Sequence, residues 1–276
     1  MGALEKEKVR LLAVQMESVI GELEINIDTV KNLLIAELEK YGGADFLFLP
    51  EVWTTGWETS VFPKCAEFGE SAKSLAMLKE IAKKYSVNIL GGSFIRSEGG
   101  KLYNSCPIIN RKGDLLGFYD KNHLFSYYGC AEGNYITRGK SPLMVELDGV
   151  KIGITICYDI RFPEIYRAYR KAGADILVNL AAWGKSKKIP WDSMTTSRAV
   201  ENQTYMVALT QTGMLADGSE NLGHSMILDY QGNILDEIEE KEGGIYAEIN
   251  LPEMYEFRDK CKVLDDIKDS YEVKTL

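Results

Sequence analysis

Short apolar runs alternate along the chain with segments whose apolar residues recur at helical spacing. The runs are rich in β-branched residues, which is typical of strands buried on both faces of a sheet. They predict strands at residues 10–16, 45–50, 87–94, 102–110, 150–157, 174–180 and 205–211. Because helical patterns separate most of these runs, the order indicates βαβ units in an α/β protein.

The helical patterns are amphipathic stripes bounded by stop signals. The first two stripes consist of Ile27, Val30, Leu34, Leu38 and Tyr41, and of Leu75, Leu78, Ala82 and Tyr85. A Gly42-Gly43 pair ends the first, as glycine commonly does after a helix. Pro163 suits the first turn of a third helix, which Gly173 ends, and a fourth helix is predicted over residues 191–202.

Two predicted hairpins interrupt this alternation, so we expect mixed sheets with helices on their outer faces. Residues 102–119 turn at Lys112-Gly113, and residues 224–249 turn at Gln231-Gly232-Asn233. No Pro/Ser/Gly-rich linker and no repeat divides residues 1–276, which predicts a single domain. Residues 253–276 are polar and rich in charge, so we expect them to form a C-terminal arm outside the core.

The charge balance limits the classes of partner. The 276 residues carry 32 basic and 41 acidic side chains, a net charge of −9. Nucleic-acid binding needs clustered Lys and Arg, and a membrane span needs a longer apolar run, so we expect neither partner. The first residues lack the apolar core of a signal peptide, and the five cysteines contain no CxxC pair. Both features favour a cytoplasmic protein with reduced thiols.

Three reactive side chains lie where predicted apolar strands end, which is where α/β proteins gather their ligand sites. Glu51 comes after residues 45–50, so its carboxylate should be partly desolvated, as a general base near neutrality requires. Lys121 leaves the 102–119 hairpin beside aromatic residues, where an ammonium group can hold an oxyanion. Cys157 lies between a strand and the Pro163 helix, where backbone N–H groups stabilise a thiolate.

Each of these residues also has an ordinary structural interpretation. Glu51 is equally suited to capping a loop, Lys121 to lying in solvent, and Cys157 to packing as a small buried hydrophobe. We expect burial of that ordinary kind for the remaining cysteines, Cys65, Cys106, Cys130 and Cys261.

Taken together, the segments point to one family. The chain resembles the nitrilase superfamily of carbon–nitrogen hydrolases in LPE ending at Glu51, KNHLF beginning at Lys121 and CYDIRFPE beginning at Cys157. It also resembles that family in SRAVENQ from Ser197 and in GHS from Gly223. The resemblance runs from Leu11 to about Asn250.

The resemblance implies a four-layer α-β-β-α sandwich and a catalytic triad. Glu51 would act as base and acid, Lys121 would stabilise the oxyanion and Cys157 would be the nucleophile. Such a site implies no metal and no cofactor, and the family's habit of pairing implies a homodimer or a higher homo-oligomer. A second glutamate of the family helps to position substrate, and Glu132 takes that role here unless it is a solvated loop carboxylate.

Within the superfamily, the first and third segments look most like the ω-amidase branch. Those enzymes release ammonia from 2-oxoglutaramate or 2-oxosuccinamate, which are small amides that carry a carboxylate. Deaminated-glutathione amidases, N-carbamoyl amide hydrolases and a catalytically silent binding protein of the same fold are the alternatives.

The pocket residues follow from the same segments. We expect the N–H of Tyr158 to bind the oxyanion and Trp183 to line the pocket. Arg161 is expected to receive the substrate carboxylate, unless it pairs with Asp159 or Glu164 and only holds the turn. Trp191, Tyr127 and Tyr128 are further aromatic candidates, for pocket or for core, and both His123 and His224 are expected to be hydrogen-bonded structural residues.

Overall fold

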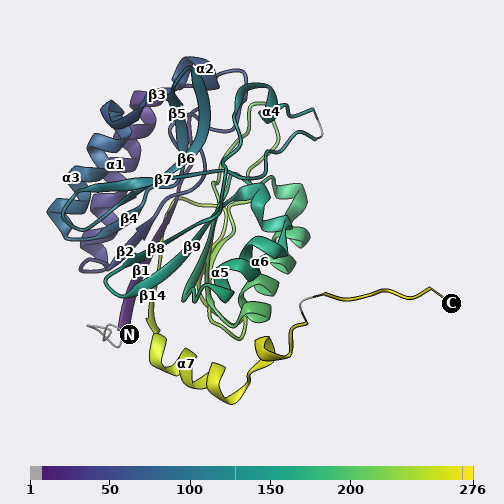
Figure 1. The fold of residues 1–276 in the computed structure, drawn as a ribbon. Helices are drawn as coiled ribbons and strands as arrows, with labels where there is room; N and C mark the ends of the chain where they lie inside the picture. The colour runs from purple at the N-terminus through teal and green to yellow at the C-terminus, as the bar shows by residue number, and fades with distance from the viewer. Residues whose placement is uncertain (1–7, 128, 269, 276) are drawn as a thin grey trace.

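Two mixed β-sheets pack face to face in the computed structural model, which describes residues 8–127, 129–268 and 270–275 (Figure 1). The first sheet has the order β14 (Gly243–Asn250), β1 (Lys8–Gln15), β2 (Phe46–Phe48), β4 (Asn88–Leu90), β6 (Lys101–Ile109), β5 (Phe94–Glu98) and β3 (Glu67–Phe68), and β7 (Leu115–Asp120) pairs with β6. The second sheet has the order β13 (Ile234–Ile238), β12 (Ser225–Leu228), β11 (Tyr205–Leu209), β10 (Ile176–Leu180), β9 (Val150–Ile156) and β8 (Leu143–Leu147).

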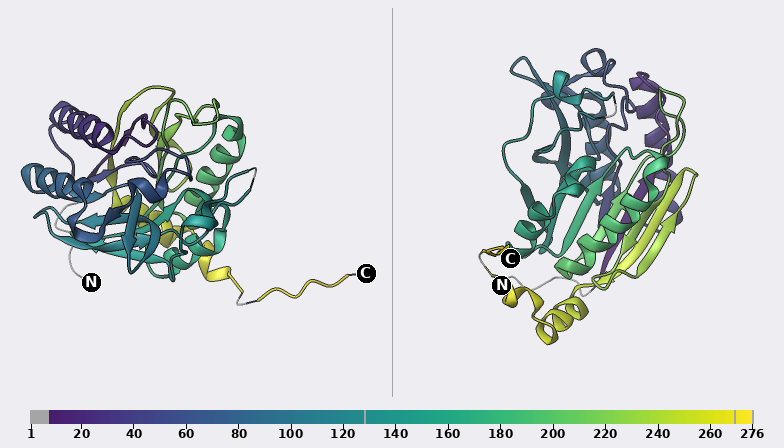
Figure 2. Two further views of the ribbon diagram at one scale, coloured as in Figure 1. Left: turned by 90° about the horizontal axis from the view of Figure 1, so that it is seen from above. Right: turned by 90° about the vertical axis from the view of Figure 1, so that its right-hand side faces the viewer.

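Helices cover the outer face of each sheet and complete the predicted four-layer α-β-β-α sandwich. The long helices are α1 (Leu23–Lys40) and α3 (Lys73–Tyr85) on the first sheet, and α5 (Pro163–Lys171) and α6 (Lys188–Asn202) on the second. The shorter helices are α2 (Phe62–Cys65), α4 (Glu132–Tyr135), α7 (Leu251–Lys260) and the 3-10 turns η1 (Gly69–Ser71), η2 (Cys157–Arg161), η3 (Lys185–Lys187) and η4 (Val263–Asp266). Figure 2 shows α1 and α3 side by side on one flank of the molecule.

The position of strand β1 explains why its residues 11–14 are all apolar. Successive side chains of a strand point to opposite faces of the sheet. Leu11 and Ala13 therefore enter the core between the sheets, while Leu12 and Val14 pack beneath the helices of the outer layer. Because both faces are covered, no position on this strand can be polar without a partner.

Two of the predicted strand runs need correction. The run 87–94 is two strands, β4 and β5, because Gly91 and Gly92 turn the chain between them. The segment 224–249 is not one hairpin. Only β12 and β13 form it, and β14 crosses to the other sheet, where it pairs antiparallel with β1. Apolar alternation specifies a buried face but not the partner strand, which is why the sequence pattern missed this crossing.

The expected burial of the additional cysteines is correct for Cys65 and Cys106 and wrong for the other two. Cys261 is exposed and Cys130 is half-buried. Both lie outside the sheets, Cys261 just after α7 and Cys130 in the loop before α4, where no second layer covers them.

The C-terminal segment has two parts. Helix α7 packs against the body of the molecule, with Leu251 and Met254 fully buried, so the expectation that residues 253–276 lie outside the core is wrong for this helix. Beyond η4 the chain runs outward (Figure 1), and Val273 is almost completely exposed. Within the described residues, no helix combines the length and apolarity that crossing a membrane requires.

Gly92 lies between β4 and β5 and packs directly against Pro50, the residue before Glu51. Replacing this glycine should destabilise the fold strongly. It has φ +65°, and a Cβ atom there would lie 2.2 Å from the carbonyl oxygen of Pro50. We expect Gly92→Ala to lower the free energy of unfolding by about 3 kcal/mol or more, since strain and a backbone clash add. Gly42 has a similar φ of +69° with no atom within 4 Å, so Gly42→Ala should cost only about 1–2 kcal/mol. Urea denaturation of both variants measures the difference, and equal losses would contradict the steric argument.

Candidate active site

The three strand-end side chains predicted from the sequence come together between the two sheets. Glu51 follows β2, Lys121 follows β7, and Cys157 follows β9 of the opposite sheet. The ends of strands from both sheets thus meet at one place. Glu51 and Lys121 are completely buried, and the exposed fraction of Cys157 is 7%.

Lys121 forms the centre of a buried ionic cluster. Its Nζ lies 2.8 Å from Oε1 of Glu51 and 3.1 and 3.0 Å from the two carboxylate oxygens of Glu132. Glu132 is also fully buried, so the interpretation as a solvated loop carboxylate is wrong. Its Oε2 accepts a further hydrogen bond from the backbone N–H of Phe125, at 2.7 Å. Each charge therefore has the partners that a dry interior demands.

The backbone of Ala182 connects Glu51 to Cys157. The N–H of Ala182 donates to Oε2 of Glu51 at 3.0 Å, and the carbonyl oxygen of the same residue lies 4.0 Å from Sγ of Cys157. The thiol and the carboxylate consequently occupy adjacent places in the site. This arrangement places a proton acceptor beside a potential nucleophile.

The backbone is strained at Cys157 and beside Glu51, the two residues that the backbone of Ala182 connects. Cys157 has φ +45° and Val52, next to Glu51, has φ +41°, a region that β-branched residues rarely adopt. Hydrogen bonds hold both residues there. The N–H of Val52 donates to Oγ of Ser93 at 2.9 Å, and the carbonyl of Cys157 accepts from Nδ2 of Asn179 at 3.2 Å. Strain that the surroundings enforce in this way is typical of functional sites.

The electrostatics of the cluster favour a neutral thiol and a charged lysine. Burial, together with the negative charge of Glu51, raises the pKa of Cys157 well above its ordinary value. Burial alone would lower the pKa of Lys121, but the carboxylates of Glu132 and Glu51 outweigh it and raise that pKa. Burial also raises the pKa of Glu132. The thiol therefore needs a base before it can attack, and the lysine remains an ammonium group.

Asp159 ties the lysine segment to the cysteine segment. Its carboxylate accepts hydrogen bonds from the backbone N–H of His123 at 2.9 Å, the hydroxyl of Tyr119 at 2.6 Å and the backbone N–H of Ile156 at 2.9 Å. The Nδ1 of His123 lies 2.7 Å from the same carboxylate, and its ring stacks on Phe162. His123 is thus hydrogen-bonded, as expected, and Asp159 has partners other than Arg161.

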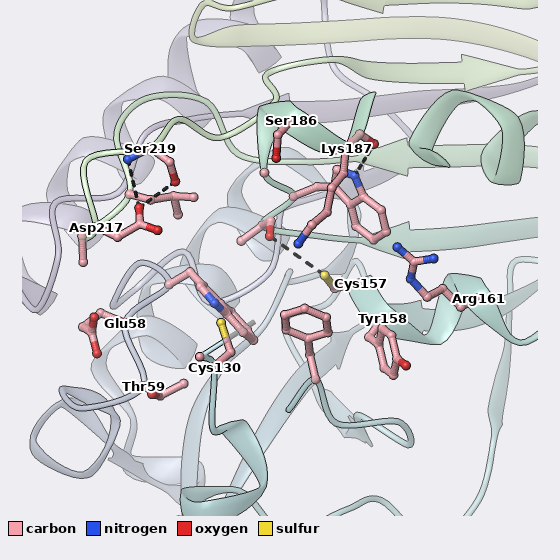
Figure 3. Close-up of a pocket in the computed structure, with 18 residues that line it drawn as sticks. Glu58, Thr59, Cys130, Cys157, Tyr158, Arg161, Ser186, Lys187, Asp217 and Ser219 are labelled. Atoms are coloured by element: carbon pink, nitrogen blue, oxygen red, sulfur yellow. Dashed lines mark hydrogen bonds between the residues drawn. The ribbon is translucent and has the colours of Figure 1, made fainter. Parts of the chain in front are cut away.

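A cavity of about 770 Å³ opens onto Cys157 (Figure 3). Tyr158, Arg161 and Trp183 line it, as do residues that the sequence analysis did not select, including Lys187. The guanidinium carbon of Arg161 lies 5.4 Å from the centre of the Trp183 ring and 6.0 Å from that of Tyr158. Figure 3 shows the side chain of Lys187 extending into the same cavity from η3.

The other aromatic candidates lie elsewhere. Trp191 is fully buried against Trp183 and donates to the carbonyl of His224 at 2.9 Å, so it belongs to the core. Tyr127 is mostly exposed and contacts the ring of Tyr158. Tyr128 lies outside the described residues.

Asn104 is the main site residue that sequence reasoning missed. Its Nδ2 contacts Oε1 of Glu51 at 2.9 Å and Oε1 of Glu132 at 3.2 Å. The available signal was the pair of polar residues Asn104 and Ser105 in the middle of strand β6, which is apolar from Cys106 to its end. Ala182 acts through its backbone, so its side chain carried no signal at all.

The two-sheet fold and this constellation of thiol, ammonium and carboxylate define a hydrolase of carbon–nitrogen bonds. The chain belongs to the carbon–nitrogen hydrolase family, whose model matches residues 10–259. The 2-oxoglutaramate amidase of Bacillus subtilis (strain 168) is 41% identical over 230 residues, which cover 83% of this chain and 87% of that protein. The omega-amidase NIT2 of Mus musculus is 31% identical over 275 residues, which cover 96% of this chain and 98% of that protein.

The solved structures agree with the architecture. The crystal structure of Saccharomyces cerevisiae Nit3, a member of branch 10 of the nitrilase superfamily, superposes with a TM-score of 0.87 at 26% identity. The match covers 94% of this chain and 96% of that one. The superfamily that the sequence segments resemble is thereby confirmed, together with its fold.

Proposed function

We propose that this protein is an ω-amidase that hydrolyses a small carboxylate-bearing amide, 2-oxoglutaramate or 2-oxosuccinamate, through a cysteine thioester. The observation that carries the proposal is the buried cluster in which Glu51 lies between the ammonium group of Lys121 and the Cys157 turn. In this interpretation Glu51, Lys121 and Cys157 form the catalytic triad, and Glu132 positions the lysine and the substrate.

The first half of the reaction forms the thioester. Glu51 takes the proton of the thiol, and the sulfur of Cys157 attacks the amide carbon. Lys121 and the backbone N–H of Tyr158 hold the resulting oxyanion. An ammonium group has three hydrogens, so one remains for the oxyanion when Glu51 and Glu132 each take one. The protonated Glu51 then gives its proton to the departing nitrogen, the carbon–nitrogen bond breaks and ammonia leaves.

The second half releases the acid. Glu51 removes a proton from water, which attacks the thioester carbonyl. The same donors hold the second oxyanion, the carbon–sulfur bond breaks and the thiol of Cys157 recovers its proton. The products are the dicarboxylic acid and the free enzyme, so one water molecule is consumed for each ammonia released.

Two observations support a substrate with a carboxylate. The relative named 2-oxoglutaramate amidase is 41% identical to this chain. In addition, Arg161 lines the cavity, and the described residues include no ion pair between it and Asp159 or Glu164. A guanidinium group can bind a carboxylate through two parallel hydrogen bonds, at a distance from the amide under attack.

The triad predicts large and non-additive effects of substitution. Cys157→Ala, Glu51→Gln and Lys121→Ala should each lower kcat by about 10³-fold or more, because the three groups act as one unit. Cys261→Ala is the matched control, since that thiol is exposed and outside the site, and it should keep wild-type activity. Ammonia release measures all four variants, and EDTA should leave the wild-type rate unchanged. Substantial turnover by Cys157→Ala would refute the mechanism, whereas a wild-type protein that releases no ammonia would favour the catalytically silent binding protein.

The role of Arg161 can be separated from a structural one by kinetics. If Arg161 binds the carboxylate, Arg161→Lys should raise KM for 2-oxoglutaramate by about 10-fold or more, because a lysine cannot supply the bidentate contact. Hydrolysis of a neutral amide of the same length should change little. A parallel loss on both substrates would make Arg161 structural. Including a deaminated peptide amide and an N-carbamoyl amino acid in the same panel tests the two alternative amidase specificities.

We also propose that the protein is cytoplasmic and works as at least a homodimer. In this proposal residues 253–276 are the C-terminal arm of a single-domain chain. The exposed part of the arm, beyond η4, would contact a second copy of the chain (Figure 1). Light scattering at micromolar concentration should give a mass of at least twice 31.0 kDa. Deleting residues 262–276 should weaken that assembly, whereas a full-length mass near that of one chain would exclude it.

A further inference from the structure

Asn104 contacts all three charged residues of the ionic cluster, two through their carboxylates and Lys121 through its backbone. Its side chain is completely buried on β6, and its Nδ2 lies 2.9 Å from Oε1 of Glu51 and 3.2 Å from Oε1 of Glu132. Its backbone carbonyl accepts the N–H of Lys121 at 2.9 Å. One residue therefore holds the lysine segment with its backbone and both carboxylates with its side chain.

The orientation of the Asn104 amide follows from charge. The two hydrogens of Nδ2 have two carboxylate acceptors, while Oδ1 is buried and has no hydrogen-bond partner among the described residues. The reversed amide would place Oδ1 against two carboxylate oxygens, which repel it. An unpaired buried carbonyl is unfavourable, so the site tolerates it in return for two donors directed at Glu51 and Glu132.

The hydrogen bonds also distinguish the two oxygens of Glu51. Oε1 accepts from both Lys121 and Asn104, at 2.8 and 2.9 Å. Oε2 accepts the backbone N–H of Ala182 at 3.0 Å, and the carbonyl oxygen of that residue lies 4.0 Å from the thiol of Cys157. Oε2 is therefore the oxygen with capacity left for a proton.

We propose that Asn104 is a positioning residue that hydrogen-bonds Glu51 and Glu132 together around Lys121 and directs Oε2 of Glu51 toward the thiol of Cys157. The proposal rests on the function proposed above and adds Asn104 to the residues that serve it. Asn104 acts through the two carboxylates. Its amide donates hydrogen bonds to them without adding a charge, whereas a second lysine would add a positive charge.

The charges around Asn104 determine what its replacement does. Glu51 comes from the end of β2, Lys121 from the end of β7, Glu132 from α4 and Cys157 from the end of β9. Arg96 and Asp120 pair with each other beside Ser105, the next residue on β6, whose side chain points the other way along the pleat. An aspartate at position 104 would make three carboxylates share one ammonium group. Because like charges disfavour ionisation, the carboxylates would then hold a proton up to a higher pH.

The test compares Asn104→Asp and Asn104→Ser with Asn88→Asp. Asn88 is a matched control, since it is a buried asparagine on the neighbouring strand β4 that also donates to a carboxylate, that of Asp148, away from the site. The acidic limb of kcat/KM for ammonia release should move up by about one pH unit or more in Asn104→Asp. Its activity near pH 7 should fall about 10- to 100-fold and recover partly at alkaline pH.

Asn104→Ser keeps a single donor, so it should shift the limb in the same direction by less, with kcat lowered more than KM is changed. Asn88→Asp should leave the limb in place. The proposal is overturned if Asn104→Ser keeps the wild-type limb and kcat, or if the Asn104 variants lose activity equally at every pH. Should Asn104→Asp fail to fold, as circular dichroism would show, Asn104→Ser alone decides.

A second measurement separates this proposal from the proposed function. Alkylation of Cys157 by iodoacetamide, followed by peptide mass spectrometry, needs no substrate. The added negative charge of Asn104→Asp should raise the pKa of the thiol and slow its alkylation at neutral pH, relative to Asn88→Asp. Absence of ammonia release by wild type would refute the amidase, while an unchanged alkylation profile in Asn104→Asp would refute the role of Asn104.

Discussion

A single, fully buried ammonium group is the constraint on which the remaining structure depends. Lys121 is fully buried, and its charge is stable there only because two carboxylates lie within 3.1 Å. Two carboxylates around one cation leave an excess negative charge, which Asn104, Ala182 and the backbone of Phe125 distribute by hydrogen bonding. Burial, reinforced by this excess charge, raises the pKa of the neighbouring Cys157 thiol, so the packing of the site and its chemistry are coupled.

The sandwich architecture satisfies this constraint by bringing the two sheets together at their strand ends. The carboxylate and the lysine come from the first sheet and the cysteine from the second, so the distance between the sheets sets the distance between base and nucleophile. Asp159 then fixes the two sides to each other through His123, Tyr119 and Ile156. A reacting group placed this way is held by the core and not by a loop alone.

Much of this could be predicted from the sequence, for reasons that differ from residue to residue. Continuous apolar runs such as that of β1 identify strands covered on both faces, and polar residues directly after such runs mark Glu51, Lys121 and Cys157. The partner of β14 could not be predicted, because alternation does not encode which sheet a strand joins. Asn104 was hidden for a related reason. One or two polar residues within a strand form no periodic pattern. The role of Asn104 is set by charged side chains that three other elements bring next to it.

The pairing of β14 with β1 has a consequence for how the chain is made. Lys8 lies opposite Asn250, so this side of β1 stays unpaired until the residues of β14 have left the ribosome. Until then β1 presents unpaired backbone groups and apolar side chains to other nascent chains. Completion of the first sheet therefore requires β1 to pair with β14, which is far from it in the sequence. Pairing over such a separation slows folding, and protection by a chaperone is valuable until it has formed. A molecule shortened before residue 243 would lack both this closing strand and the docking helix α7, although every residue of the catalytic cluster would be present.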